Sequence, residues 1–236
     1  ISLSALTSDQ INALSTVGIN QLSGKQIAGL TASQLSGITS TAFGALTTAA
    51  INSLSVAQTP KLATNLVAAL TSTQVNALNS SALNALTSLQ LTNLSTTAVS
   101  KLDKLSQLTN TNLKALTTAQ AAVLTTAQVS ALSSTALAVL GGDRLNALST
   151  DALKTISSTK IQGFTTAQIN ALNSASFAAL TTQAINALSA TQAKGLSNGV
   201  LSTLSTSEIN ALSSAALNAL SSAQVGQIAT AALAKT

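Results

Sequence analysis

Ser157 and Lys160 have the residue types and the spacing of a catalytic serine and the lysine that activates it. The run 157–160 (SSTK) matches the Ser-x-x-Lys motif of penicillin-binding enzymes, in which a neighbouring lysine makes the serine nucleophilic. The Ser-Asp-Asn and Lys-Thr-Gly partner motifs are absent, and serine is so frequent here that the match is expected by accident. We therefore predict no catalytic residue.

Asp143 and Asp151 are two carboxylates whose spacing could place them side by side. They lie eight residues apart and could share a hard cation. Arg144 stands beside the first of them, however, and stabilisation of a helix start explains both aspartates without an ion. We predict no metal site.

The composition excludes most other chemistry. Without His or Cys, the usual zinc, haem and iron–sulfur ligand sets and the Ser-His and Cys-His nucleophiles cannot be built. The net charge is +5, but Trp and Tyr are absent, so bases have no stacking platform. No stretch approaches the roughly 18 apolar residues of a membrane span. We predict a protein that is not an enzyme, has no cofactor and binds no nucleic acid.

An eight-residue repeat, or octad, organises the chain. With positions named a to h and Leu6 taken as a, a large apolar residue recurs at every eighth position up to Leu102 and, after one six-residue step, from Leu108 to Ile228. The consensus is Leu-(Ser/Thr)-x-x-(Gln/Ala)-(Ile/Val/Leu)-Asn-Ala. Rows a and f are therefore apolar, and row b carries hydroxyl side chains.

This spacing favours a short helix that restarts in every octad. In a continuous strand, a and f would lie on opposite faces, and in a continuous helix row a would spiral around the surface. With the hydroxyl at b as N-cap, e is N3, f is N4 and the helix ends near the next a. Gln or Glu at e then completes a capping box, as in residues 165–168 (TTAQ) and 205–208 (STSE).

The signs of the charges agree with repeated helix polarity. Acidic residues fall in the cap or first turn, where the helix dipole favours them: Asp9, Asp103, Asp143, Asp151 and Glu208. Most lysines fall at g or h, in the last turn. Three basic residues depart from the rule: Lys25, Arg144 and Lys160.

Helices this short are unstable alone, so the octads must stack. We predict an all-α fold, an α-solenoid of about two-turn helices, with rows a and f as its core. Phe43, Phe164 and Phe177 fall in these rows and are expected to fill the core. A weaker alternation of Gln and Ala at e suggests two octads per coil. We predict one continuous array over residues 1–236.

Irregularities lie near residues 59–70, 101–108 and 141–142. Pro60 at position g predicts that Thr59 becomes the N-cap of a longer helix running to about Leu70. The six-residue step at 101–108 predicts a fused or reshaped helix. The glycine pair at 141–142 predicts a left-handed helix stop. None of them is expected to divide the chain into domains.

Two surface features could bind a partner. Lys101, Lys104 and Lys114 cluster around the six-residue step and could contact an acidic partner, although a solvated face explains them too. The Ser and Thr of rows b and c could bind ice or a polysaccharide. Capping already employs row b, and free interchange of Ser and Thr would match a crystal lattice poorly.

The repeat resembles the Leu-(Ser/Thr)-(Ser/Thr)-Ala-Gln-(Ile/Val)-x-Ala-Leu arrays of long, low-charge secreted or surface proteins of Gram-negative bacteria. Residues 116–132, 164–172 and 220–228 are most similar to these arrays, and the resemblance covers nearly the whole chain. It brings no catalytic residues. It implies an extracellular or cell-surface location and a stalk, adhesin or filament role.

These observations favour a structural protein that assembles with itself. Solenoids that stay monomeric carry polar capping repeats, whereas both ends of this chain look like its interior. Apolar ends invite head-to-tail stacking, which propagates into fibres. The residues expected in that contact are Ile1, Leu3, Leu6, Ile228 and Leu233. The chain could instead be a fragment of a longer array, or a module that binds a protein, a glycan or ice.

Overall fold

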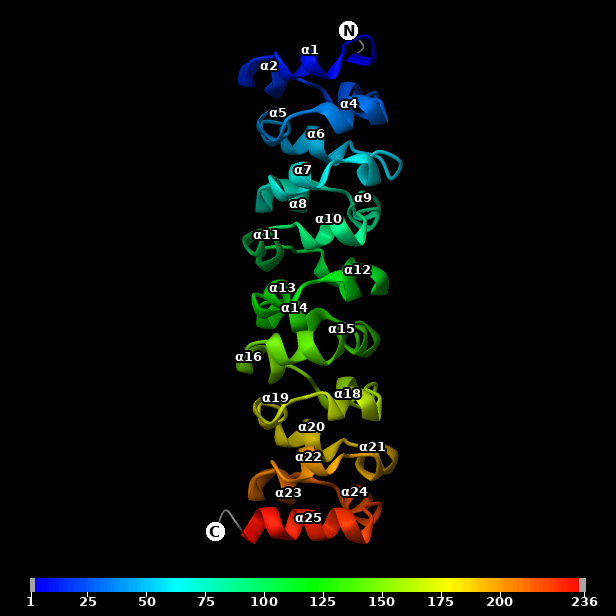
Figure 1. Ribbon diagram of the computed structural model, residues 1–236, viewed down its shortest axis with the longest axis vertical. Coiled ribbons are helices and arrows are strands. Elements are labelled where there is room, and N and C mark those ends of the chain that lie inside the picture. The colour runs from blue at the N-terminus through cyan, green and yellow to red at the C-terminus, as the bar shows by residue number, and fades with distance from the viewer. Residues whose placement is uncertain (1–2, 234–236) are drawn as a thin grey trace. The chain divides into compact units, whose positions relative to one another are not determined.

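The computed structural model describes residues 3–233, except for the side chains of Ser4 and of residues 229–233. These residues form a succession of short helices and contain no strand, which confirms the predicted all-α fold (Figure 1). None of the described helices has both the length and the apolar character that crossing a bilayer requires. The chain divides into two compact units, residues 1–120 and 121–236.

The first unit contains η1 (Leu3–Ala5), α1 (Ser8–Asn12), α2 (Thr16–Asn20), α3 (Gly24–Ala28), α4 (Ala32–Gly37), α5 (Ser40–Gly44), α6 (Thr48–Asn52), η2 (Thr59–Lys61), α7 (Thr64–Ala68), α8 (Ser72–Ala77), α9 (Ser80–Asn84), α10 (Ser88–Thr92), α11 (Thr96–Ser100), η3 (Leu105–Gln107) and α12 (Asn110–Ala115). The unit boundary falls within α13 (Thr118–Ala122).

The second unit contains α14 (Thr126–Ala131), α15 (Ser134–Ala147), α16 (Thr150–Leu153), α17 (Ser158–Ile161), α18 (Thr166–Asn170), α19 (Ser174–Ala178), α20 (Thr182–Asn186), α21 (Ala190–Lys194), α22 (Asn198–Leu201), α23 (Thr206–Ala211), α24 (Ser214–Asn218) and α25 (Ser222–Leu233). The elements labelled η are 3₁₀ helices.

Capping at row b starts these helices, as predicted. Thr165 has the extended backbone of an N-cap (φ −72°, ψ 157°), and its side chain accepts a hydrogen bond from the Gln168 amide. The Gln168 side chain accepts in return from the Thr165 amide, which completes the capping box. Ser205 and Glu208 form the second predicted box. A few residues of each octad thus satisfy the amides that a helix start leaves open.

Each coil contains three octads, so the suggestion of two octads per coil is wrong. Helices three octads apart contact one another in both units, such as α3 with α6 and α20 with α23. The alternation of Gln and Ala at position e does not distinguish octads on one side of a coil from octads on the other. Gln74 and Ala82, at e in successive octads, are 5% and 0% exposed, so both face the interior.

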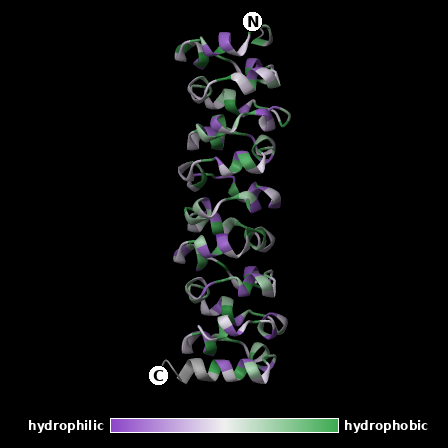
Figure 2. Cartoon of the chain, viewed as in Figure 1, coloured by the Kyte–Doolittle hydropathy of each residue, from purple (hydrophilic) through white to green (hydrophobic). Residues whose placement is uncertain are grey.

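Rows a and f form the core of each unit, as predicted. Phe43, Phe164 and Phe177 are at most 3% exposed, which confirms that they fill it. Figure 2 shows apolar residues recurring between polar ones along the coils of both units. Each coil therefore contributes its own share of the hydrophobic stabilisation, as expected for a solenoid.

Pro60 does not start a longer helix, contrary to the sequence prediction. It lies in the 3₁₀ helix η2, whose N-cap is Gln58, and a separate helix, α7, follows. Thr59 keeps its position f inside the core, fully buried. A continuous helix would have had to run through the turn at Leu62, whose extended backbone (φ −64°, ψ 135°) instead preserves row a.

The other two irregularities are closer to expectation. The six-residue step is reshaped into the 3₁₀ helix η3, flanked by the buried Leu102 and Leu108. Gly141 has a positive φ, as predicted, but its φ of 76° and ψ of 167° lie in the extended region open only to glycine, rather than in the left-handed helical region. The chain is therefore kinked inside α15 at the position where other octads place their N-cap.

Candidate functional site

A buried row of glutamines at position e, which we call the inner row, joins neighbouring coils. The Gln90 Oε1 accepts from the Thr87 amide at 2.8 Å, which caps its own helix. The Gln90 Nε2 donates to the Leu62 carbonyl at 2.7 Å and to the Thr59 carbonyl at 2.9 Å, both in the preceding coil. One side chain thus starts a helix and fastens it to the coil before it.

The inner row repeats this bond along the chain. Its members that donate to the carbonyl of row a, 28 residues earlier, are Gln34, Gln58, Gln74, Gln90, Gln192 and Gln224. Gln120 makes the same contact 26 residues back, across the six-residue step. Sequence reasoning gave e a capping role only. The recurrence of Gln rather than Glu at e is a sequence signal for this second role. Glu would accept the capping bond equally well, but it has no amide group to donate to a neighbouring coil.

Asparagines at position g form an outer row, which joins neighbouring coils at the exposed edge. The Asn146 Nδ2 donates to the Ala171 carbonyl at 2.8 Å, and its Oδ1 accepts from the Asn173 amide at 2.9 Å. The side chains that make both bonds, 25 and 27 residues ahead, are Asn12, Asn76, Asn146 and Asn170. The octad pattern alone predicts no role for Asn at g, although Asn recurs at that position.

Small residues allow the coils to approach. A Cβ added to Gly142, at position c, would lie 2.4 Å from the Cβ of Ala171, at position h one coil later. A Cβ added to Gly163, at h, would lie 2.6 Å from the Cβ of Ser134, at c. Positions c and h of adjacent coils therefore face each other, which explains the small side chains there.

Two lysines occupy the inner row in place of glutamine. The Lys104 Nζ donates to the carbonyls of Asn76 and Leu78, at 2.8 and 2.6 Å. The Lys160 Nζ donates to the carbonyls of Val129 and Ser130, at 3.3 and 2.5 Å. The solvated-face interpretation is thus wrong for Lys104.

The Ser-x-x-Lys run does not bring its lysine to its serine. The Ser157 hydroxyl pairs with the Thr159 hydroxyl at 3.0 Å, whereas the Lys160 Nζ is directed to carbonyls of the preceding coil. Partial burial lowers the pKa of Lys160 from its ordinary 10.5. Ser157 is the N-cap of α17 but makes no side-chain capping bond.

Asp9, Asp151 and Glu208 lie in the first turn of a helix, as predicted, whereas Asp103 lies between α11 and η3 and Asp143 lies inside α15. Asp151 forms an ion pair with Lys154 within one octad, at 3.1 Å between Oδ1 and Nζ. Within residues 3–233, no three or more Asp, Glu, His or Cys side chains come together as a metal site would require.

The residues expected in an end-to-end contact fall at both limits of the described chain. Leu3 and Ile228 are buried and Leu6 is partly buried. Ile1 and the side chain of Leu233 lie outside the described residues.

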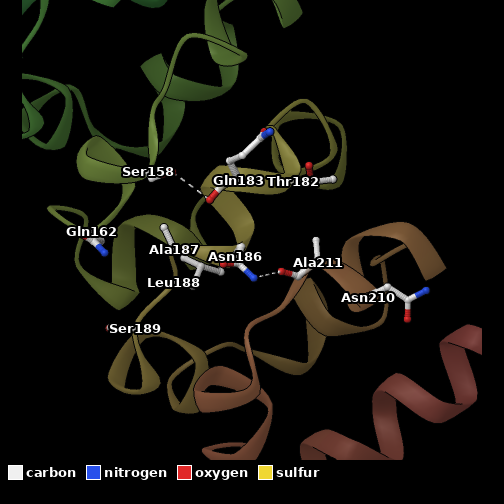
Figure 3. A pocket seen from close by; sticks show the side chains of 10 residues that line it. All are labelled: Ser158, Gln162, Thr182, Gln183, Asn186, Ala187, Leu188, Ser189, Asn210 and Ala211. Carbon is white, nitrogen blue, oxygen red and sulfur yellow. Dashed lines mark hydrogen bonds between the residues drawn. The ribbon is translucent and has the colours of Figure 1, made fainter.

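A groove of about 790 Å³ lies along the outer row of the second unit (Figure 3). Amide and hydroxyl side chains line it: Ser158, Gln162, Thr182, Gln183, Asn186, Ser189 and Asn210. Figure 3 shows Asn186 reaching the Ala211 carbonyl and Ser158 reaching the Gln183 carbonyl, with bonds of 3.1 Å each. The groove presents hydrogen-bonding groups but no charged or aromatic side chain.

A protein-family model described as the ALTTAQ repeat matches residues 145–182. The match spans the elements from the end of α15 to the start of α20 and includes Asn146 of the outer row and Gln168, a partly exposed glutamine at position e. No curated protein and no solved structure matches the chain. The chain is thus a tandem-repeat protein with a helical, solenoid-like architecture.

Proposed function

We propose that the chain is a non-enzymatic structural protein, a subunit of an extracellular filament or a surface stalk. The observation that carries this proposal is the inner row, which uses buried polar side chains to join coils. Every buried side-chain nitrogen or oxygen of the described residues has a hydrogen-bond partner. Such satisfied polar interiors rigidify a structure and specify a single arrangement.

The geometry of a coil supports extension by copies of the same chain. One side of a coil offers the carbonyls of rows a and f, as Leu62 and Thr59 do, and the other offers amide donors from row e, as Gln90 does. Two such sides are complementary whether the coils belong to one chain or to two. A heterologous contact of this kind propagates into fibres.

An extracellular location is part of the proposal. Only 6% of the residues are charged, so neutral hydroxyl and amide groups keep the surface hydrated. The hydration of these groups is insensitive to salt and pH, which suits a protein outside the cell, where both vary. The resemblance to secreted and surface arrays of Gram-negative bacteria supports the same location.

Sedimentation velocity and negative-stain electron microscopy over a concentration series test self-assembly. We expect filaments whose population grows with concentration. Gln10→Glu should weaken the association about tenfold, because Glu keeps the capping bond to Thr7 but removes an exposed row-e donor.

Gln162→Glu is the matched control, since it makes the same change at position g and should assemble like the unaltered chain. A chain that stays monomeric throughout the series, or a Gln10→Glu variant that assembles normally, contradicts the filament form of the proposal.

The groove of the second unit favours one alternative, a module that binds a neutral glycan. Its amide and hydroxyl groups can donate to and accept from sugar hydroxyls. Isothermal titration with soluble polysaccharides, comparing the unaltered chain with Gln183→Ala, tests it. Saturable heat that this variant loses would favour the module.

A further inference from the structure

Glu208 reverses the hydrogen-bonding polarity of the inner row. Its Oε2 accepts from the Ser205 amide at 2.6 Å and from the Ser205 hydroxyl, which is the capping role of a row-e side chain. Where glutamine would carry Nε2, the carboxylate carries Oε1, an acceptor. No donor among the described residues bonds Oε1, although Glu208 is only 8% exposed. The residue as a whole is 8% exposed, and Oε1 is open to solvent, because every buried side-chain oxygen of the described residues has a hydrogen-bond partner.

The carbonyl that glutamine would meet is also without a donor. Gln192 donates to the row-a carbonyl of Phe164, 28 residues earlier, and Gln224 donates to that of Leu196. The equivalent residue for Glu208 is Leu180, and within the described part of the chain its carbonyl accepts no hydrogen bond. Two oxygens without bound protons therefore meet at one inter-coil position, where Gln or Lys at position e supplies a donor elsewhere in the chain, as Gln192, Gln224 and Lys104 do.

An open pocket of about 480 Å³ lies at this position. Leu180, Ser205 and Glu208 line it, together with the apolar side chains of Ala178 and Ile185. No Lys or Arg of residues 3–233 lies within ion-pair distance of Glu208. The pocket combines one carboxylate oxygen of Glu208, one carbonyl acceptor and a short apolar wall.

The same inter-coil position accepts an ammonium group elsewhere in the chain. The Lys104 Nζ and the Lys160 Nζ each donate to two carbonyls of the preceding coil, at distances from 2.5 to 3.3 Å. In both octads the ammonium replaces a glutamine amide. An ammonium has three donors and no acceptor, so it matches a set of carbonyl and carboxylate oxygens.

We propose that the pocket at Glu208 binds a primary ammonium group that carries a short aliphatic chain. The ammonium donates to the Glu208 Oε1 and the Leu180 carbonyl, where the array elsewhere places its own Gln or Lys. The aliphatic chain lies against Ala178 and Ile185. A quaternary ammonium, which has no N–H donor, cannot make these bonds.

Thermal unfolding followed by circular dichroism, with n-butylammonium chloride titrated at constant ionic strength, tests the proposal. We expect a saturable rise of the midpoint, because a ligand that binds only the folded state stabilises it. Butyltrimethylammonium at equal concentration should leave the midpoint unchanged.

Glu208→Gln should bind butylammonium at least about tenfold more weakly, and it should unfold at a higher temperature in plain buffer, because its amide then donates to the Leu180 carbonyl. Asp151→Asn, which removes a carboxylate at an exposed site, is the matched control and should respond like the unaltered chain.

Two results would overturn the proposal. The first is an equal response of Glu208→Gln and the unaltered chain to butylammonium. The second is an equal effect of the quaternary ammonium or of sodium alone.

Discussion

The inner and outer rows make similar numbers of bonds between coils, but in different surroundings. Gln90 is 2% exposed and makes two bonds to the preceding coil, while Asn146, on the accessible edge, makes two to the following coil. Water can replace the partners of Asn146 when they separate, but it cannot reach those of Gln90. The comparison teaches that burial, rather than the number of bonds, determines what each row contributes to stability.

The largest effect is expected from Gln90→Ala. It leaves the Thr59 and Leu62 carbonyls without their donor, removes the cap bond to Thr87 and opens a cavity. We expect a loss of about 3 kcal/mol in the free energy of unfolding, measured by denaturant titration followed by circular dichroism.

Gln10→Ala separates capping from coil joining, because Gln10 is exposed and accepts the same cap bond from the Thr7 amide. It should cost less than about 1 kcal/mol. Equal losses for the two variants would show that the inner row acts through capping alone.

A gain in stability is expected from Lys160→Gln. The substitution restores the inner-row amide and the missing capping bond of Ser157, and it removes a partly desolvated charge. We expect the midpoint of denaturant unfolding to rise by an amount equivalent to about 1.5 kcal/mol near neutral pH.

The pH dependence of this gain has a defined sign. Burial lowers the pKa of Lys160 in the folded chain below 10.5, so the unfolded chain binds the proton more tightly. The lysine's destabilising contribution is full below the folded pKa and is lost between that pKa and 10.5, where the folded chain has released the proton and the unfolded chain still holds it. The advantage of Lys160→Gln should therefore shrink toward about pH 10, and an advantage that grows would contradict the stated cause.

The smallest effect is expected from Asn146→Ala. Loss of its two bonds at the exposed edge should cost about 0.5–1 kcal/mol, because water takes over both partners. Hydrogen exchange of the Asn173 amide should accelerate with it. Asn20→Ala is the control, since Asn20 is also at g but makes no side-chain bond to a described residue. A loss equal to that of Gln90→Ala would remove the distinction between the rows.

The local structure could be predicted from the sequence, because it depends on residues a few positions apart. Thr165 and Gln168 satisfy each other's amides within one helix start, so their spacing predicts the structure. The number of octads per coil could not be predicted, because Gln74 and Ala82 are both buried at e and their alternation reports no side of the coil.

The candidate site could be predicted only in part. Glu208 was recognised as a capping residue, which needs only its partner Ser205. The lack of a donor for its second oxygen could not be predicted. The carbonyl that faces this oxygen belongs to Leu180, one coil earlier, and that pairing is known only once a coil is known to contain three octads. The length of the coil, a tertiary property, was the missing information.

The coil-to-coil bonds span 25 to 31 residues along the chain wherever the octads are regular. Each bond therefore closes a loop of similar, modest length, and no bond of this kind ties together remote parts of the sequence. A molecule built in this way should respond to tension by lengthening in equal steps, because each rupture frees one coil and leaves its neighbours folded. The same property allows refolding to proceed from whatever coils remain.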